Sequence, residues 1–243
     1  MQNINKGSIL WKTQKIFETL TPFTLLDFEN TPSSILWFSG CNMRCGFCYN
    51  PEIVHGIGEF SFEDLESFFE TRQNLLQGVV LCGGEPTIHK QIIEIAKQLK
   101  KLGYKIKLDT NGLKPEIIKI LVEQKLIDFI ALDFKAPKEK FTEVTKCSLK
   151  EYENFLKTLQ FLIENHFHFE VRTTFCDRLL ELADIEEMID ILEVQNYKGV
   201  YALQNFLSLK QTIGKIENTN KLNLLYTLED KSKLPFSIKF RNF

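Results

Sequence analysis

The sequence predicts an α/β protein in which a parallel sheet carries helices on its outside. Six short apolar segments suited to buried strands recur at intervals of roughly 25 to 45 residues. Stretches with helical spacing lie between them. Polar residues stand directly after the strands, at the sheet edge where α/β proteins build their sites. These observations favour one α/β domain with its chemistry at the carboxyl edge of the sheet.

The apolar segments set the expected strands, because short Val, Ile and Leu runs are typical of strands buried on both faces. The six strands are predicted at residues 34–38, 78–82, 104–108, 129–132, 169–174 and 199–203. Shorter strands are expected at 23–28 and 235–240, whereas residues 1–21 show only a weak pattern.

Capping residues mark the helices. Ser61 and Ser148 each precede a periodic apolar run, and Asp64 and Glu151 follow three residues later, as in a capping box. Gly103 suits a helix end. Helices are predicted at 62–69, 88–102, 115–124, 148–165, 185–196 and 222–228, with loops at 51–59 and 136–147.

No stretch of the chain has the composition of a linker. We expect an N-terminal extension at residues 1–22, one core domain at 23–206, and a C-terminal tail at 207–243 that packs on the core.

Composition excludes several classes of function. The 243 residues are 44% hydrophobic and 26% charged, with a net charge of −2, so neither nucleic acid nor an anionic membrane is an expected partner. The N-terminus lacks the apolar core of a signal peptide, and no apolar run approaches about 20 residues. We therefore expect a cytoplasmic protein. Clustered cysteines in that compartment indicate metal binding or catalysis rather than disulfides.

Three of the six cysteines, Cys41, Cys45 and Cys48, form a C-x3-C-x2-C cluster. Three thiolates can hold three irons of a 4Fe-4S cluster and leave the fourth iron open to a small molecule. A structural zinc site is the alternative, but it needs a fourth protein ligand, which His55 could supply.

The later strand ends carry groups suited to a charged ligand. Gly83 and Gly84 can expose backbone groups, and Glu85 can accept hydrogen bonds from an ammonium; a tight turn is the simpler interpretation. Two acids at neighbouring strand ends, Asp109 and Asp133, would repel unless a cation lies beside them. The simpler interpretation makes Asp109 a helix cap.

Two basic residues accompany these acids. Lys135 follows Asp133 closely, and Arg172 can grip a carboxylate through two hydrogen bonds. The alternatives are a solvated lysine and an ordinary surface ion pair.

The cysteine cluster, with Phe47 just before its third cysteine, resembles the radical S-adenosylmethionine (SAM) superfamily. This resemblance implies a partial (β/α)6 barrel with a parallel sheet and outer helices, and SAM bound to the open iron. An electron from the cluster would cleave SAM to methionine and a 5′-deoxyadenosyl radical, so no separate catalytic side chain is expected. Gly83-Gly84-Glu85-Pro86 resembles the superfamily's GGE motif.

Two further segments resemble the glycyl-radical activating enzymes, Asp109-Thr110-Asn111-Gly112 and Asp133-Phe134-Lys135. The resemblance implies a monovalent cation at Asp109 and Asp133. It also implies SAM-binding roles for a set of residues at the strand ends and in the cysteine loop: Phe47, Gly83, Gly84, Glu85, Asn111, Lys135, Arg172 and Gln204.

Residues 23–51 are similar to the activating proteins of anaerobic ribonucleoside-triphosphate reductase, and the likeness extends over 23–206. It implies that the partner is a glycyl-radical enzyme, an anaerobic ribonucleotide reductase, with a flavodoxin- or ferredoxin-type electron donor. One departure is that Phe28-Glu29-Asn30 stands where a Pro-Gly-like turn is expected. The alternatives are a radical SAM enzyme acting on a small molecule or a peptide, such as a deazapurine synthase-like or peptide-modifying enzyme, and a non-catalytic iron-sulfur or zinc protein.

Overall fold

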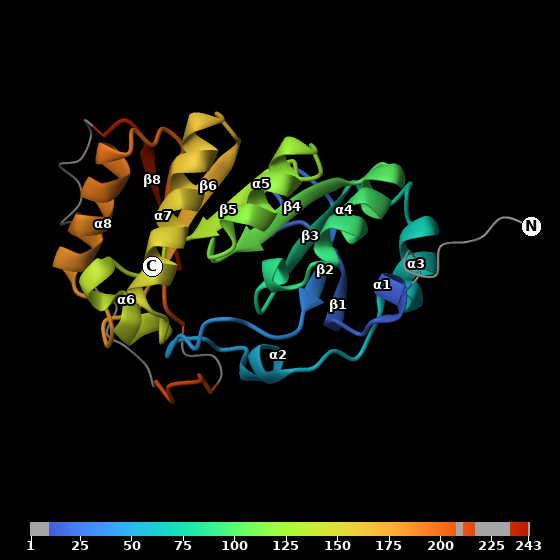
Figure 1. Cartoon of the computed structure of the whole chain (residues 1–243), viewed down its shortest axis with the longest axis horizontal. Coiled ribbons are helices and arrows are strands. Elements are labelled where there is room, and N and C mark those ends of the chain that lie inside the picture. Colours follow the sequence, from blue (N-terminus) through green and yellow to red (C-terminus); the bar gives the residue numbers. More distant parts are fainter. Residues whose placement is uncertain (1–9, 208–210, 217–233, 243) are drawn as a thin grey trace, which may run out of the picture. The chain divides into compact units, whose positions relative to one another are not determined.

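A computed structural model describes residues 10–207, 211–216 and 234–242 (Figure 1). These residues include eight strands, whose order in the sheet is β1 to β8. Their bounds are β1 Phe17–Thr24, β2 Ser33–Phe38, β3 Gly78–Gly83, β4 Lys105–Thr110, β5 Phe129–Asp133, β6 Phe169–Phe175, β7 Val200–Asn205 and β8 Ser237–Arg241.

Helices connect the strands in the alternation that the sequence predicted. They are α1 Leu10–Thr13, α2 Pro51–His55, α3 Phe62–Glu70, the 3-10 turn η2 Pro86–Ile88, α4 Ile92–Lys101, α5 Pro115–Glu123, α6 Lys138–Thr145, α7 Leu149–Glu164 and α8 Leu182–Val194. β2 pairs in parallel with β3, β3 with β4, β6 with β7 and β7 with β8. The fold is therefore α/β with a mostly parallel, open sheet, as the expected partial barrel requires.

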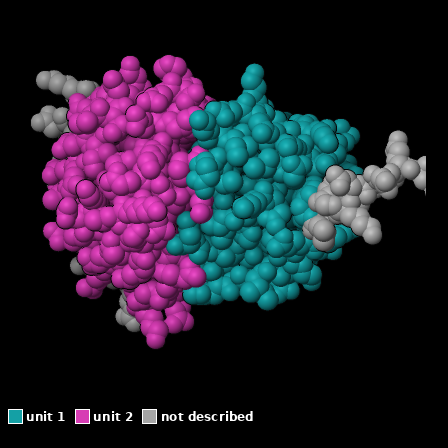
Figure 2. All heavy atoms as spheres, in the orientation of Figure 1, with its two compact units in different colours: residues 1–42, 52–110, 116–130 teal, residues 43–51, 111–115, 131–243 magenta. Residues whose placement is uncertain are grey.

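The chain divides into two compact units (Figure 2). The first comprises residues 1–42, 52–110 and 116–130, and the second comprises 43–51, 111–115 and 131–243. The division into an extension, a core and a tail at residues 22 and 206 stays a prediction.

The core of the first unit contains a row of aromatic rings. Phe62 and Phe69 of α3 stack with their centroids 6.3 Å apart, and Phe69 meets Tyr104 edge-on at 5.9 Å. The buried Tyr104 hydroxyl donates to the Phe69 carbonyl at 2.6 Å, so its polar end is satisfied. The predicted capping box at Ser61 and Asp64 starts α3 and fixes this aromatic face toward the core.

The core of the second unit packs α7 against the end of β5. Phe134 and Phe155 stack at 4.7 Å, and the predicted capping box at Ser148 and Glu151 begins α7. The buried Tyr197 hydroxyl accepts from Val171 N–H and donates to the Val200 carbonyl, which ties the starts of β6 and β7 together.

Several predicted boundaries were wrong. The strand expected at 23–28 is β1, Phe17–Thr24, which runs antiparallel to β2 within a segment whose pattern looked weak. Short helices α2 and α6 occupy the expected loops at 51–59 and 136–147. The helix expected from residue 88 begins at Ile92 after η2, and α8 begins at Leu182 rather than 185. The expected helix 222–228 lies outside the described residues.

Candidate functional site

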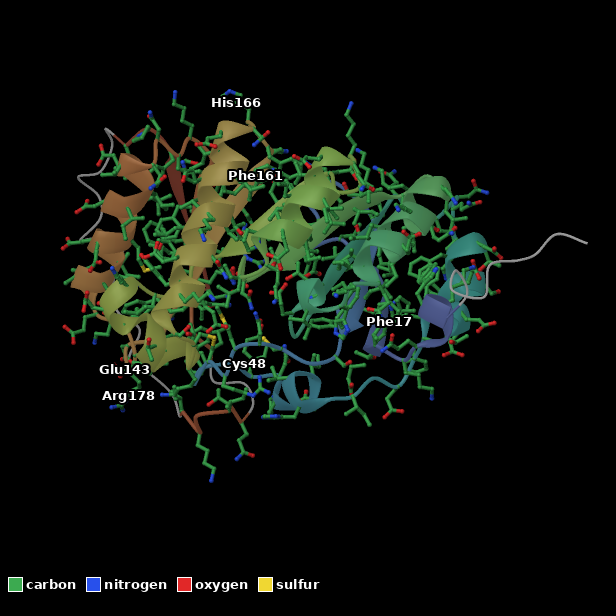
Figure 3. All side chains as sticks on the ribbon, in the orientation of Figure 1. Phe17, Cys48, Glu143, Phe161, His166 and Arg178 are labelled. Carbon is green, nitrogen blue, oxygen red and sulfur yellow. The ribbon has the colours of Figure 1, made fainter. Side chains whose placement is uncertain are left out.

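The cysteine loop, residues 39–50, follows β2. Cys41 belongs to the first unit, and Cys45 and Cys48 belong to the second; Cys48 lies in the coil just before α2 (Figure 3). None of the three thiols forms a disulfide. Cys48 N–H donates to the Cys45 carbonyl at 3.0 Å, which closes a tight turn. Gly40 enters the loop with a φ of +75°, a conformation that favours glycine.

In the second unit, a segment near the C-terminus holds the loop by its backbone. Gly214 N–H donates to the Gly46 carbonyl at 2.8 Å, and Ile213 N–H donates to the Cys48 carbonyl at 2.9 Å. A Cβ on Gly214 would lie 2.9 Å from Gly46 Cα, so only glycine permits this approach. Sequence reasoning missed this contact, because nothing local to residues 212–216 points to it.

Burial shifts the pKa of Cys45, the second cysteine of the cluster. Cys45 is 6% exposed, and burial raises the pKa of its thiol to about 12, although Lys135 acts in the opposite direction. A bound metal ion would reverse this balance, because a coordinating thiol is deprotonated outright. Among the described residues, no three His, Cys, Asp or Glu side chains are gathered where they could hold a metal ion.

In the first unit, the glycines after β3 serve close packing. A Cβ on Gly83 would lie 2.4 Å from Phe38 N and O, and one on Gly84 would lie 1.8 Å from the Gly40 carbonyl oxygen. Gly84 N–H donates to Phe38 O, and Glu85 N–H donates to Gly40 O. Because neither glycine has a side chain, the end of β3 packs closely against the start of the cysteine loop.

Glu85 anchors this end of the sheet. The side chain is 1% exposed, and its Oε1 accepts from Thr87 N–H, from Thr87 Oγ1 and, at 2.8 Å, from Thr110 Oγ1. Glu85 thereby caps η2 and joins β3 to the end of β4. The two interpretations of the Gly-Gly-Glu segment are thus compatible, since a tight turn holds the carboxylate in place.

Asp109, at the end of β4, pairs with a lysine that sequence reasoning missed. Lys107 Nζ lies 3.1 Å from Asp109 Oδ1, and both side chains are almost fully buried. The same ammonium donates to the Asp27 carbonyl. The signal was present, because residues two apart on a strand point to the same face.

The predicted Asn111-Gly112 turn is built by its own side chain. Asn111 Oδ1 accepts from Leu113 N–H at 3.1 Å, and Gly112 has a φ of +77°. The Gly112 carbonyl accepts from Thr158 Oγ1 of α7 at 2.6 Å. In place of the helix cap considered for Asp109, the turn after β4 uses Asn111.

The end of β5 and the middle of β6 form one ion-pair network in the second unit. Lys135 Nζ lies 3.0 Å from Asp133 Oδ2, and Arg172 Nε lies 3.0 Å from Asp133 Oδ1. The three side chains are only 16–24% exposed, so Lys135 is not a solvated charge and Arg172 is not a surface ion pair. Lys135 Nζ also lies 5.6 Å from the centre of the Phe47 ring, which brings the cysteine loop to this network.

The network shifts the ionisation of its members. Burial acts to raise the pKa of Asp133, but Arg172 and Lys135 outweigh it and hold that pKa below its ordinary value. Burial likewise acts to lower the pKa of Lys135, but Asp133 and Cys45 outweigh it and raise that pKa. All three groups of the network are therefore charged at neutral pH.

The charged side chains beside Asp109 and Asp133 bear on the monovalent cation predicted there. Each carboxylate already has a protein cation beside it, Lys107 in one unit and Lys135 with Arg172 in the other. Nothing in the described residues supports the predicted ion.

Gln204 is the penultimate residue of β7 in the second unit and lines a pocket of about 300 Å³. Tyr49, which follows Cys48 directly, lines the same pocket. The predicted position of Gln204 at a strand end is confirmed, whereas its contact with SAM stays a prediction.

The sequence matches the family model "Radical SAM superfamily" over residues 35–192. A Methanocaldococcus jannaschii protein, provisionally named a glycyl-radical enzyme activating enzyme, is 34% identical over 196 residues, which is 77% of this chain and 78% of the relative. A 7-carboxy-7-deazaguanine synthase of Aquifex aeolicus is 26% identical over 174 residues, 63% of this chain and 77% of that protein.

Solved structures share the fold. Streptococcus suis SuiB bound to its precursor peptide SuiA superposes with a TM-score of 0.66 at 18% identity over 84% of this chain, and SuiB bound to S-adenosylmethionine gives 0.64 at 16% over 85%. The match spans about half of the SuiB chain, 48% and 51%. No helix in the described ranges is long and apolar enough to cross a membrane. The family match covers well over half of the sequence and includes the cysteine loop, so this chain belongs to the radical SAM superfamily.

Proposed function

We propose that this radical SAM enzyme generates a glycyl radical on a partner protein, an anaerobic ribonucleotide reductase. The observation that carries the proposal is the 34% identity, over about three quarters of both chains, to a protein named for glycyl-radical enzyme activation. The Asp-Thr-Asn-Gly and Asp-x-Lys segments lie within the matching part and support the same assignment.

Cys41, Cys45 and Cys48 would hold a 4Fe-4S cluster. The chemistry of the three residues suits this group, because none of the thiols forms a disulfide and cysteine thiolates are the ligands of iron-sulfur clusters. When loaded, the cluster supplies one electron that breaks the S–C5′ bond of SAM, giving methionine and a radical that takes a hydrogen atom from the substrate. A flavodoxin- or ferredoxin-type protein in the cytoplasm would deliver that electron.

The side chains of this protein would bind and orient SAM. Lys135 and Arg172 both contact Asp133, so two cationic side chains lie together in a partly buried place. Such a place attracts the SAM carboxylate. Glu85 would accept from the amino group, and Phe47 would keep Lys135 in position. Asn111 and Gln204 would supply further polar contacts, and Gly83 and Gly84 would hold the turn.

The test is anaerobic incubation of the reconstituted protein with SAM, dithionite and the reductase encoded in the same genome. We expect a glycine-centred electron paramagnetic resonance signal on the reductase, with one 5′-deoxyadenosine formed for each radical. SAM cleavage that leaves no radical on the reductase would overturn the assignment.

A second candidate is a small-molecule reaction, because the deazaguanine synthase of Aquifex aeolicus also matches 63% of the chain. Peptide modification is a related candidate, since SuiB with its bound peptide shares the fold. Deuterium labelling separates them. Transfer of deuterium from α-deuterated glycine of the reductase into 5′-deoxyadenosine supports the glycyl-radical function, and transfer from a labelled purine precursor supports the synthase.

A further inference from the structure

The imidazole of His89 lies beside the start of the cysteine loop in the first unit. Its Nε2 lies 2.7 Å from the carbonyl oxygen of Ser39, a residue 50 positions earlier in the chain. A carbonyl oxygen can only accept, so Nε2 carries the hydrogen of this bond. The ring also packs against Phe38, with the two centroids 5.7 Å apart. Burial lowers the pKa of His89, although the bond to Ser39 acts in the opposite direction, so the ring is neutral at neutral pH.

The turn after β3 presents this ring to the loop. His89 ends η2, where its N–H donates to the Pro86 carbonyl at 3.2 Å. The His89 carbonyl in turn accepts from Ile92 N–H, at the start of α4, at 3.0 Å. Glu85 caps the other end of η2. The backbone of His89 is therefore fixed on both sides, and the capped turn holds the ring in its place.

The peptide group between Ser39 and Gly40 is held at both of its polar atoms. Its oxygen accepts from His89, and its N–H, which belongs to Gly40, donates to the Ile53 carbonyl of α2 at 2.8 Å. Hydrogen bonds at the two ends of one peptide group polarise it and strengthen each other. Cys41 follows directly, so these two bonds fix the direction in which the chain reaches the first cysteine of the cluster.

We propose that His89 is a positioning residue for the iron-sulfur cluster, because its hydrogen bond to the Ser39 carbonyl holds the peptide that leads into Cys41. A group outside the coordination sphere commonly orients a metal ligand in this way. A ligand that is already held in place needs no reordering when iron binds. The inference rests on the proposed function only in assigning Cys41 to the cluster, and it is independent of the partner protein.

The first test measures how fast iodoacetamide alkylates each cysteine of the full-length protein without iron, followed by mass spectrometry. His89→Leu keeps the approximate bulk and removes the donor, so we expect Cys41 to react about tenfold faster, as for the loss of one hydrogen bond. His89→Gln offers an amide N–H in place of Nε2–H and should restore the wild-type rate. Cys48 of the second unit and Cys82 of the first should react at the wild-type rate in both variants.

Iron retention gives a second measurement, made on the reconstituted protein. We expect His89→Leu to lose iron to a chelator about tenfold faster than the wild type, for the same reason, and His89→Gln to retain its iron. Lys90→Leu is the matched control, because Lys90 is the exposed neighbour of His89. This control should keep the wild-type rates of both alkylation and iron loss.

The outcomes separate a positioning role from a merely structural one. If Cys82 becomes reactive together with Cys41 in His89→Leu, the substitution loosens the whole unit and the inference is wrong. It is also wrong if His89→Gln behaves as His89→Leu does, because the hydrogen bond is then not the cause. If the wild type binds iron and Cys41 keeps its rate in His89→Leu, the inference alone fails. If the reconstituted wild type binds no iron, the proposed function fails and the inference fails with it.

Discussion

Substituting Gly84 by alanine tests how the strand end and the cysteine loop fit together. The new Cβ would lie 1.8 Å from the Gly40 carbonyl oxygen and 2.6 Å from its carbon. Contacts of a Cβ below about 3.0 Å essentially do not occur, so the two backbones must separate by more than about 1 Å. That movement breaks the Glu85 N–H to Gly40 C=O hydrogen bond, now 2.9 Å long.

The expected cost follows from these two effects. Overpacking costs about 1–3 kcal/mol, and the lost hydrogen bond costs about 1 kcal/mol. The free energy of unfolding of Gly84→Ala should fall by about 2–4 kcal/mol, which lowers the Tm by roughly 4–16 °C for a chain of this size. Because Cys41 Cβ lies 3.3 Å from the new methyl, iron incorporation should fall as well.

The assay compares thermal unfolding of the apoprotein and iron content after reconstitution with those of Gly103→Ala. Gly103 also has a positive φ, +88°, but no atom lies within 4 Å of its added Cβ. The control therefore carries only the backbone strain, about 1–2 kcal/mol, and should load iron normally. If Gly84→Ala loads as much iron as Gly103→Ala and is equally stable, the close packing argued here is wrong.

Four other variants probe the loop and the ion-pair network. Cys45→Ala should abolish iron binding and SAM cleavage while circular dichroism stays unchanged, whereas Cys147→Ala should keep its iron; iron loss in the latter would reveal a misassigned ligand. Asp133→Asn removes the charged carboxylate that Lys135 and Arg172 both contact, so at neutral pH it should cost about 3 kcal/mol in urea unfolding. The pKa of Asp133 is lower in the folded protein than in the unfolded chain. The stabilisation is therefore fully present above the unfolded pKa of about 4 and is lost as the pH falls through the folded pKa. If the variant's loss of unfolding free energy relative to the wild type stays the same at low pH, this account is wrong. Gly214→Ala should force the cysteine loop aside and weaken iron retention under chelator challenge; wild-type retention would show that the contact is dispensable.

Local patterns in the sequence determined the elements that local physics builds. The capping boxes at Ser61 and Ser148 form as expected, because both partners of each box are three residues apart. Gly103 takes the left-handed conformation that ends α4, and the apolar runs become the parallel strands. The missed helices α2 and α6 are short, and α6 has few apolar positions. β1 was misplaced because its exposure pattern is irregular and its partner β2 decides its register.

In the candidate site, too, the sequence predicted some features and only the tertiary structure showed others. The sequence alone determined the superfamily, through three cysteines within eight residues and polar groups at the strand ends. Only the tertiary structure decided which remote groups meet: Arg172 with Asp133 across 39 positions, and Gly214 against Gly46. The physical reason is distance along the chain. Spacing and composition report neighbours within a few residues, whereas strand register and backbone packing bring remote residues together, and the contact of Gly214 with Gly46 holds the cysteine loop.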